Sequence, residues 1–139
     1  MTFSSSRADF RIAMVLGGVA ALMRLAGVQR AVAVLDRLVR SRPAGLRPDE
    51  QVVVAIRVAR RVQAVAARMP GKPRCLVRSV ALAAALRRRG IPANVKVGVA
   101  MDSGFTAHAW VEVHGLPVTD DPRYTGQYRS IWTARHVTG

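Results

Sequence analysis

The segment at residues 72–90, KPRCLVRSVALAAALRRRG, constrains the fold most, because it places the only cysteine of the chain at the start of a predicted helix. Pro73 disfavours helix immediately upstream, and Gly90 followed by Pro92 supplies a stop signal. We therefore expect Cys75 in the first helical turn. The apolar residues between these signals recur at the three- to four-residue spacing of an amphipathic helix: Leu76, Val80, Ala83, Ala84 and Leu86.

Cys75 has two interpretations in this position. The unpaired N–H groups and the dipole at a helix N-terminus favour the thiolate, which is the nucleophilic form of cysteine. Free cysteine is also among the most buried residue types, so Cys75 could be a small apolar residue at a loop-to-helix junction. The segment by itself leaves both interpretations open.

The chain is strongly basic, with 22 Lys and Arg residues against 8 Asp and Glu among 139, and a formal net charge of +14. This balance favours an anionic partner, which can be nucleic acid, an acidic peptide or protein, or anionic lipid headgroups. Nucleic acid fits least, because the few aromatic residues do not interleave with the basic ones and one cysteine gives no zinc-finger spacing. A metal site built from His108, Glu112 and His114 is also disfavoured, because no histidine pair has helical spacing.

The cysteine count and the N-terminal sequence both bear on the cellular compartment of the protein. One cysteine cannot form an internal disulfide, and no secretory signal opens the chain, so we expect a cytoplasmic protein. The uncharged run at residues 12–23 is shorter than the roughly 20 residues that a bilayer span needs. We expect this run to be buried or to face a partner, with at most peripheral membrane contact.

Helices are predicted in the first two thirds of the chain and strands in the last third. The helical part comprises a frayed start at residues 1–9, one or two helices from about residue 10 to 40, a linker at 41–48 and a helix at 49–68. The alternation of Val95, Val97 and Val99 predicts a strand, followed by a turn at 102–104. Two further strands are expected at 105–113 and 116–120, and antiparallel pairing follows from the short connections. Residues 121–139 predict a loop with a short element near Ile131.

The helix at residues 49–68 has two distinct faces. Its apolar residues lie on one face, and on another lie four basic residues that we call the arginine stripe: Arg57, Arg60, Arg61 and Arg68. The stripe is either a solvated helix surface or a docking surface for an acidic partner.

A cysteine nucleophile needs a base that accepts its proton and a third group that orients the base. His108 lies within the second predicted strand, and Asp120 ends the third. Neighbouring antiparallel strands could place Asp120 beside His108, and a helix across them could bring Cys75 within reach. The alternative is a histidine whose hydrogen bonds are satisfied within the sheet.

The two sequences CLVRSVALAAALRRRGIPANVKVGV and FTAHAWVEVHGLPVTD strongly resemble the transglutaminase-like cysteine peptidases of lasso-peptide biosynthesis, the stand-alone B2 type. The resemblance is close over about residues 69–121. It implies an α+β fold with a papain- or transglutaminase-like core, in which a helix carrying cysteine packs on a small antiparallel sheet. It assigns the nucleophile to Cys75, the base to His108 and the orienting carboxylate to Asp120, with Asp121 as a near alternative.

The function implied by this resemblance is removal of the leader from a ribosomally made precursor, before a separate cyclase forms the macrolactam. The implied partners are the precursor peptide, a separate leader-binding protein of the B1 type and the cyclase, and no metal or organic cofactor is implied. Residues 1–48 would form an N-terminal helical region and linker, and residues 49–139 the peptidase core, within one compact domain. The alternatives are an amine-transferring acyltransferase with the same residues and a non-catalytic scaffold that binds the precursor.

Overall fold

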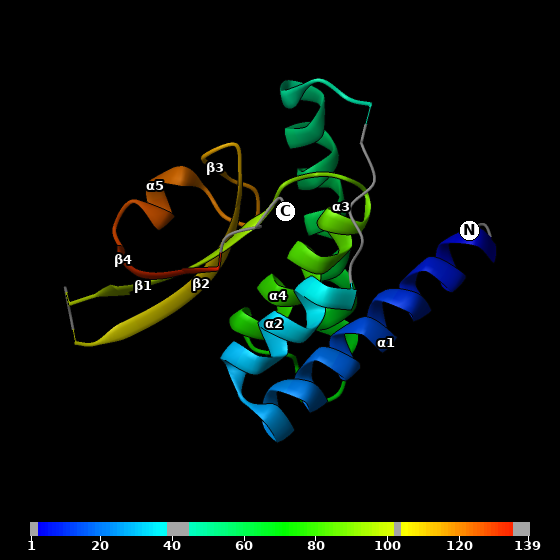
Figure 1. The fold of residues 1–139 in the computed structure, drawn as a ribbon, viewed down its shortest axis with the longest axis horizontal. Coiled ribbons are helices and arrows are strands. Elements are labelled where there is room, and N and C mark those ends of the chain that lie inside the picture. The colour runs from blue at the N-terminus through cyan, green and yellow to red at the C-terminus, as the bar shows by residue number, and fades with distance from the viewer. Residues whose placement is uncertain (1–2, 39–44, 102–103, 135–139) are drawn as a thin grey trace.

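The computed structural model describes residues 3–38, 45–101 and 104–134, and it places a group of helices beside an antiparallel sheet (Figure 1). The elements in chain order are α1 (Phe3–Ala26), α2 (Val28–Leu38), α3 (Pro48–Arg68), α4 (Cys75–Arg88), β1 (Asn94–Ala100), β2 (Thr106–Val113), β3 (Leu116–Pro117), α5 (Pro122–Thr125) and β4 (Arg129–Ala134). The predicted α+β class is confirmed. Within the described residues, none of the helices combines the length and the apolar composition needed to cross a membrane.

The helix α4 lies between the sheet and the other long helices, and it is buried on nearly all sides from Ser79 to Arg87. The amphipathic pattern predicted one buried face, but the alanines of α4 let neighbours approach from several directions. Arg87 is buried at the end of this helix, and its guanidinium donates from Nε and Nη2 to the carbonyl oxygen of Ala93 at 3.0 and 2.9 Å. The end of α4 and the approach to β1 are thereby held together.

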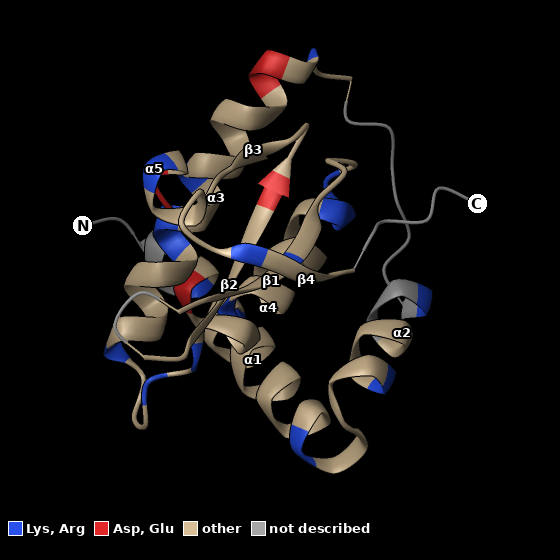
Figure 2. Cartoon of the chain, turned by 90° about the vertical axis from the view of Figure 1, so that its left-hand side faces the viewer, with Lys and Arg blue, Asp and Glu red and all other residues tan. Residues whose placement is uncertain are grey.

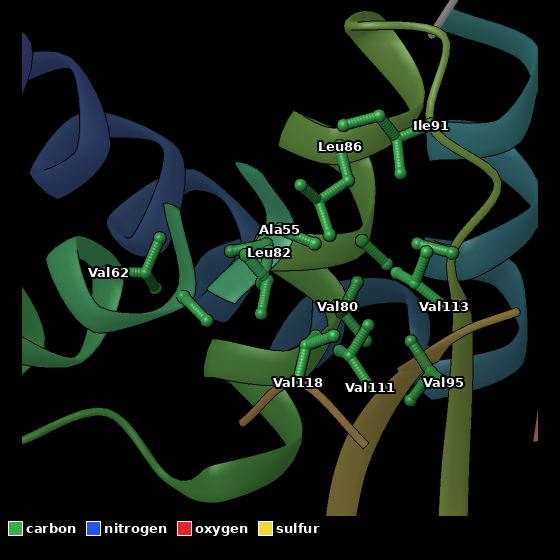
Figure 3. Packing of buried hydrophobic residues seen from close by; sticks show 14 of the residues in the cluster. Ala55, Val62, Val80, Leu82, Leu86, Ile91, Val95, Val111, Val113 and Val118 are labelled. Carbon is green, nitrogen blue, oxygen red and sulfur yellow. The ribbon is translucent and has the colours of Figure 1, made fainter. Parts of the chain in front are cut away.

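One hydrophobic core joins the helices to the sheet. Leu82 and Leu86 of α4 meet Val111 and Val113 of β2 within it (Figure 3). Leu16 of α1 belongs to the same cluster. The N-terminal helices therefore pack into the core that the cysteine helix and the sheet share.

The sheet has the strand order β3-β2-β1-β4 and is antiparallel throughout, as predicted. Val95 of β1 pairs with Val111 of β2, and Gly98 pairs with His108. Because side chains alternate between faces, His108 and Trp110 lie on the face opposite the valines that contact α4.

Gly98 is required by the packing on that second face. A Cβ atom at this position would come within 2.8 Å of the Trp110 ring and of Tyr128 Cβ. The strand pairing of β1 with β4 shifts register at the same place, between Val97 and Gly98. A bulge and a missing side chain together make room for the two aromatic residues.

The helix α3 carries the arginine stripe on its exposed side and buries an alanine- and valine-rich face: Ala55, Ala59, Val62, Val65 and Ala66. All four arginines of the stripe are exposed. Arg61, however, forms an ion pair with Asp9 of α1, with Nε and Oδ1 3.0 Å apart. One member of the stripe therefore connects two helices of the fold.

Two predictions about element boundaries are wrong. The frayed start at residues 1–9 is helical from Phe3, and Asp9 is held by the distant Arg61, a contact that local sequence does not reveal. The third strand ends at Pro117 rather than at residue 120, although Val118 N still donates to Val111 O at 2.9 Å. The N–H of Val111 bonds to the side-chain hydroxyl of Thr119 and not to the carbonyl of Val118, the residue opposite it, so the ladder does not continue.

The C-terminal segment contains more structure than its sequence pattern predicted. It forms α5, which was not predicted, and β4, which includes the short element expected near Ile131. Residues 102 and 103 of the predicted turn lie outside the described residues.

Candidate active site

Cys75 is the first residue of α4, which confirms its predicted place in the first turn. The chain reaches it through a tight turn in which Gly71 and Lys72 both have positive φ, 76° and 35°. Arg74 is the N-cap in extended conformation, and its carbonyl accepts the first helical hydrogen bond from Arg78 N at 3.1 Å. The thiol is partly exposed, and the N–H of Cys75 is among those that the α-helix leaves without an intrahelical partner.

His108 of β2 and Asp120 form a hydrogen-bonded pair. His108 Nε2 lies 3.0 Å from Asp120 Oδ2, and the two side chains are only 17% and 22% exposed. A carboxylate accepts hydrogen bonds and cannot donate them, so Nε2 carries the hydrogen and donates. The neutral imidazole then has Nδ1 free to accept a proton.

Thr119 contacts the same oxygen of the Asp120 carboxylate as His108 does. Its hydroxyl donates to Asp120 Oδ2 at 3.1 Å and accepts from Val111 N at 3.3 Å. The carboxylate that orients His108 is therefore itself oriented by the backbone of the strand that carries His108.

A pocket brings the predicted site residues together. Cys75, His108 and Asp120 all line it, with surrounding residues from α3, α4, β2 and the segment after β3: Ala59, Val62, Gln63, Arg78, Ser79, Leu82, Ala109 and Thr119. Asp121, the alternative carboxylate, is not among the lining residues. It is the N-cap of α5, and its Oδ1 accepts from Arg123 N at 2.8 Å.

Aromatic rings surround His108, and we call Trp110, Tyr124 and Tyr128 the aromatic cluster. Their ring centroids lie 6.2, 5.2 and 5.5 Å from that of His108. Sequence reasoning missed the two tyrosines, because residues 121–128 show no periodicity. The one available signal was their closeness in the chain to Asp120.

The phenol of Tyr124 lies beside the pocket. Its hydroxyl is 3.0 Å from that of Tyr128, and this hydrogen bond is the main reason that the pKa of Tyr124 is raised. Partial desolvation and the negative charge of Tyr128, Asp120 and Cys75 in their ionised forms raise this pKa further. Tyr124 therefore stays uncharged at neutral pH.

The helix α3 is connected to the Asp120 loop by Gln63, a second residue that sequence reasoning missed. Gln63 lines the pocket, and its Nε2 donates to the carbonyl oxygen of Thr119 at 2.9 Å. At the other end of the β2–β3 hairpin, His114 Nε2 lies 2.7 Å from Gln51 Oε1. Two glutamines of one helix thus hold both ends of this hairpin.

The residues considered for a metal site have other partners. Glu112 accepts from Trp110 Nε1 at 3.0 Å and pairs with Lys96 at 3.1 Å. His108 and His114 bond to Asp120 and Gln51. Among the residues that the structure describes, no group of three His, Cys, Asp or Glu side chains could hold a metal ion.

Comparison with known families gives one result that covers most of the chain. The model of the Transglutaminase-like superfamily matches residues 15–133, which include Cys75, His108, Asp120 and both tyrosines of the aromatic cluster. The match begins inside α1 and ends inside β4. No curated protein and no solved structure matches the chain significantly.

Proposed function

Because the chain belongs to the Transglutaminase-like superfamily, we propose that it is a cysteine peptidase that removes the leader from a lasso-peptide precursor. The observation that carries the peptidase assignment is the pocket shared by Cys75, His108 and Asp120, with His108 and Asp120 3.0 Å apart. The choice of substrate rests on the resemblance of residues 69–121 to leader peptidases of lasso-peptide biosynthesis. The reaction precedes macrolactam formation by a separate cyclase, and we place it in the cytoplasm.

Acylation begins when His108 Nδ1 accepts the thiol proton of Cys75. The sulfur attacks the scissile carbonyl carbon, and the C–N bond breaks as His108 returns the proton to the departing amine. The leader is then bound to Cys75 as a thioester, and the core peptide leaves with a free N-terminal amine. The N–H of Cys75 is suited to stabilise the oxyanion, because it lies at the start of α4.

Deacylation uses water. His108 takes a proton from the water as its oxygen attacks the thioester carbonyl, and the C–S bond breaks. The leader leaves with a carboxylate, and the proton returns to the sulfur. Asp120 keeps Nδ1 of His108 directed for both steps and stabilises the imidazolium that forms between them.

The partners that fit this function are the precursor, a separate leader-binding protein and the cyclase. A partner that tethers the leader raises the effective concentration of substrate at the pocket without adding a contact at the scissile bond. The arginine stripe on α3 is a candidate docking surface for an acidic partner, because α3 also lines the pocket through Gln63. Charge complementarity there would mainly increase the rate of encounter.

The test is a reconstitution with the precursor and the leader-binding protein that we expect to be encoded beside this gene. Mass spectrometry should detect a free leader carboxylate and a core peptide with a new N-terminus, and Cys75→Ala should yield neither. A neighbourhood without precursor and cyclase genes contradicts the lasso assignment.

The same assay separates the alternative activities if a primary amine such as cadaverine is added. A leader that carries the amine as an amide identifies an acyltransferase. Binding of the precursor without any cleavage identifies a scaffold. Full cleavage by Cys75→Ala contradicts a cysteine mechanism of any kind.

A further inference from the structure

The helix α1 is apolar on both sides, although the rest of the molecule covers only one. Leu16 and Val19 on its inner side are buried in the core. On the opposite side Phe10, Met14 and Leu25 are 67%, 62% and 88% exposed. A helix with apolar residues all round is normally buried on all sides, so the outer side of α1 calls for an additional contact.

The exposed residues form a strip along the helix, which we call the outer face of α1: Phe10, Met14, Ala21 and Leu25. Phe10, Met14, Ala21 and Leu25 fall within about 60° of one another at 100° per residue. From Phe10 to Leu25 the strip is about 22 Å long at 1.5 Å per residue. No charged residue interrupts α1 between Arg11 and Arg24.

We propose that the outer face of α1 lies on an anionic lipid surface, with the helix axis in the plane of the membrane. This inference does not depend on the proposed peptidase function. A helix in this orientation inserts only one of its sides into the lipid.

The basic residues of α1 fit this orientation. Arg7, Arg11 and Arg24 are exposed, with Arg11 and Arg24 at opposite margins of the strip. Arginine can keep its guanidinium at the headgroups while its methylene chain covers apolar surface. The only acidic residue of α1, Asp9, is paired with Arg61 and lies off the outer face.

Charge and shape favour lipid over a second copy of the chain or a protein groove. The chain carries a net charge of +14, so two copies that met along α1 would repel each other. Basic residues also predominate over acidic ones on the sheet side of the molecule, which faces the viewer in Figure 2, so the excess of positive charge is spread over the molecule and is not confined to α1. The exposed strip runs along most of one helix at the surface of the molecule. A flat bilayer surface can contact the whole strip at once.

Membrane contact through this face leaves the pocket open. Figure 1 shows α1 and the sheet on opposite sides of α3 and α4. The pocket is lined from α3, α4, β2 and the segment after β3. A membrane-bound molecule would therefore present its pocket away from the lipid.

The test is flotation of the purified protein with vesicles of phosphatidylcholine alone and with about one third phosphatidylglycerol. The wild type should float with the anionic vesicles and retain part of its binding in 0.5 M salt. The variant Phe10→Ser/Met14→Ser/Leu25→Ser should lose about tenfold or more in partitioning, because apolar insertion is removed. The matched control Val53→Ser/Met101→Ser/Ile131→Ser changes three residues that are 56%, 71% and 61% exposed elsewhere, and it should bind like the wild type.

Two further variants test whether the position of the positive charges matters for binding. Arg7→Gln/Arg11→Gln/Arg24→Gln should weaken binding more than Arg57→Gln/Arg60→Gln/Arg68→Gln, although each variant loses three charges. The proposal is overturned if the serine variant of α1 binds like its control, because net charge then explains all of the binding. It is also overturned if the wild type does not bind anionic vesicles, or if sedimentation shows a dimer that the serine variant of α1 abolishes. Circular dichroism must show the native helix content in each variant.

Discussion

The carboxylates of Asp120 and Asp121 are adjacent in the chain but bind different groups. Asp120 Oδ2 meets His108 Nε2 at 3.0 Å, whereas Asp121 Oδ1 caps α5 through Arg123 N at 2.8 Å. Both residues lie in the short segment between β3 and α5. Only the first of the two carboxylates is placed to orient a base.

We therefore expect Asp120→Asn and Asp121→Asn to have different effects. Asp120→Asn should lower kcat by about 100-fold or more, because the asparagine can hold the wrong imidazole tautomer. Asp121→Asn should leave kcat nearly unchanged, since asparagine is also a good N-cap. Steady-state kinetics of leader cleavage measures both, and equal losses would contradict the assignment of Asp120.

Gln63→Ala should lower kcat severalfold, because the Thr119 carbonyl loses its donor and the Asp120 loop is less firmly held. Loss of one partly buried hydrogen bond should also cost about 1 kcal/mol in the free energy of unfolding. Gln51→Ala, which removes the other glutamine contact of α3, is the matched control. It should cost similar stability and leave kcat unchanged. If both variants reduce kcat in proportion to stability, Gln63 has only a structural role.

Gly98→Ala should destabilise the protein by about 1–3 kcal/mol, because its Cβ would overlap the Trp110 ring and Tyr128. Gly17→Ala on the exposed side of α1 should instead stabilise it, by up to about 1 kcal/mol, because nothing lies within 4 Å of that position and alanine is the better helix former. Urea unfolding followed by circular dichroism gives both values. A neutral Gly98→Ala would mean that the second face of the sheet is packed loosely.

The raised pKa of Tyr124 predicts an alkaline effect. Folding favours its protonated form, so this contribution to stability is complete below the ordinary tyrosine pKa of about 10 and is lost as pH rises through the higher folded value. Tyr128→Phe should move the Tyr124 pKa back toward its ordinary value, because the main cause is the hydrogen bond between the two hydroxyls. Ultraviolet titration of tyrosinate measures the change, and an unchanged Tyr124 titration would contradict this cause.

Reversing part of the arginine stripe should weaken stimulation by the leader-binding protein. Arg57→Glu/Arg60→Glu is the suitable variant, because the ion pair of Arg61 with Asp9 would make a change at Arg61 affect the fold. Cleavage should be measured with and without the partner across a salt series, since screening weakens the wild-type contact. Unchanged stimulation and salt dependence would show that the stripe is a solvated surface. Cleavage without partner is the internal control.

Much of the fold followed from local signals. Pro73 and Gly90 delimit the cysteine helix, and the alternating valines mark β1, so their elements were predictable. Periodicity did not determine which face of β2 meets α4, because both faces carry residues that can be buried. That face depends on Trp110 and Tyr128 packing over Gly98, a contact between three separate segments.

The candidate site was predictable only in part. Cys75, His108 and Asp120 were placed by the helix start, by the strand pattern and by the family resemblance. Gln63 looked like any polar residue of α3, because its role depends on where the Thr119 carbonyl lies. Tyr124 and Tyr128 lie in a segment without periodicity, and only the folded chain brings them to His108.

The two glutamine contacts of α3 connect the width of the pocket to the packing of the helices, and so connect substrate preference to residues outside the pocket chemistry. His108 and Asp120 belong to a hairpin that Gln51 and Gln63 attach to α3, whereas Cys75 belongs to α4. The width of the pocket between sulfur and imidazole then depends on how closely α3 packs against α4, and Ala59 lines the pocket from α3. Substitutions that add or remove methyl groups on that buried face would widen or narrow the distance between sulfur and imidazole without altering any reacting atom. Changes in the core would then allow the pocket to accept different leaders.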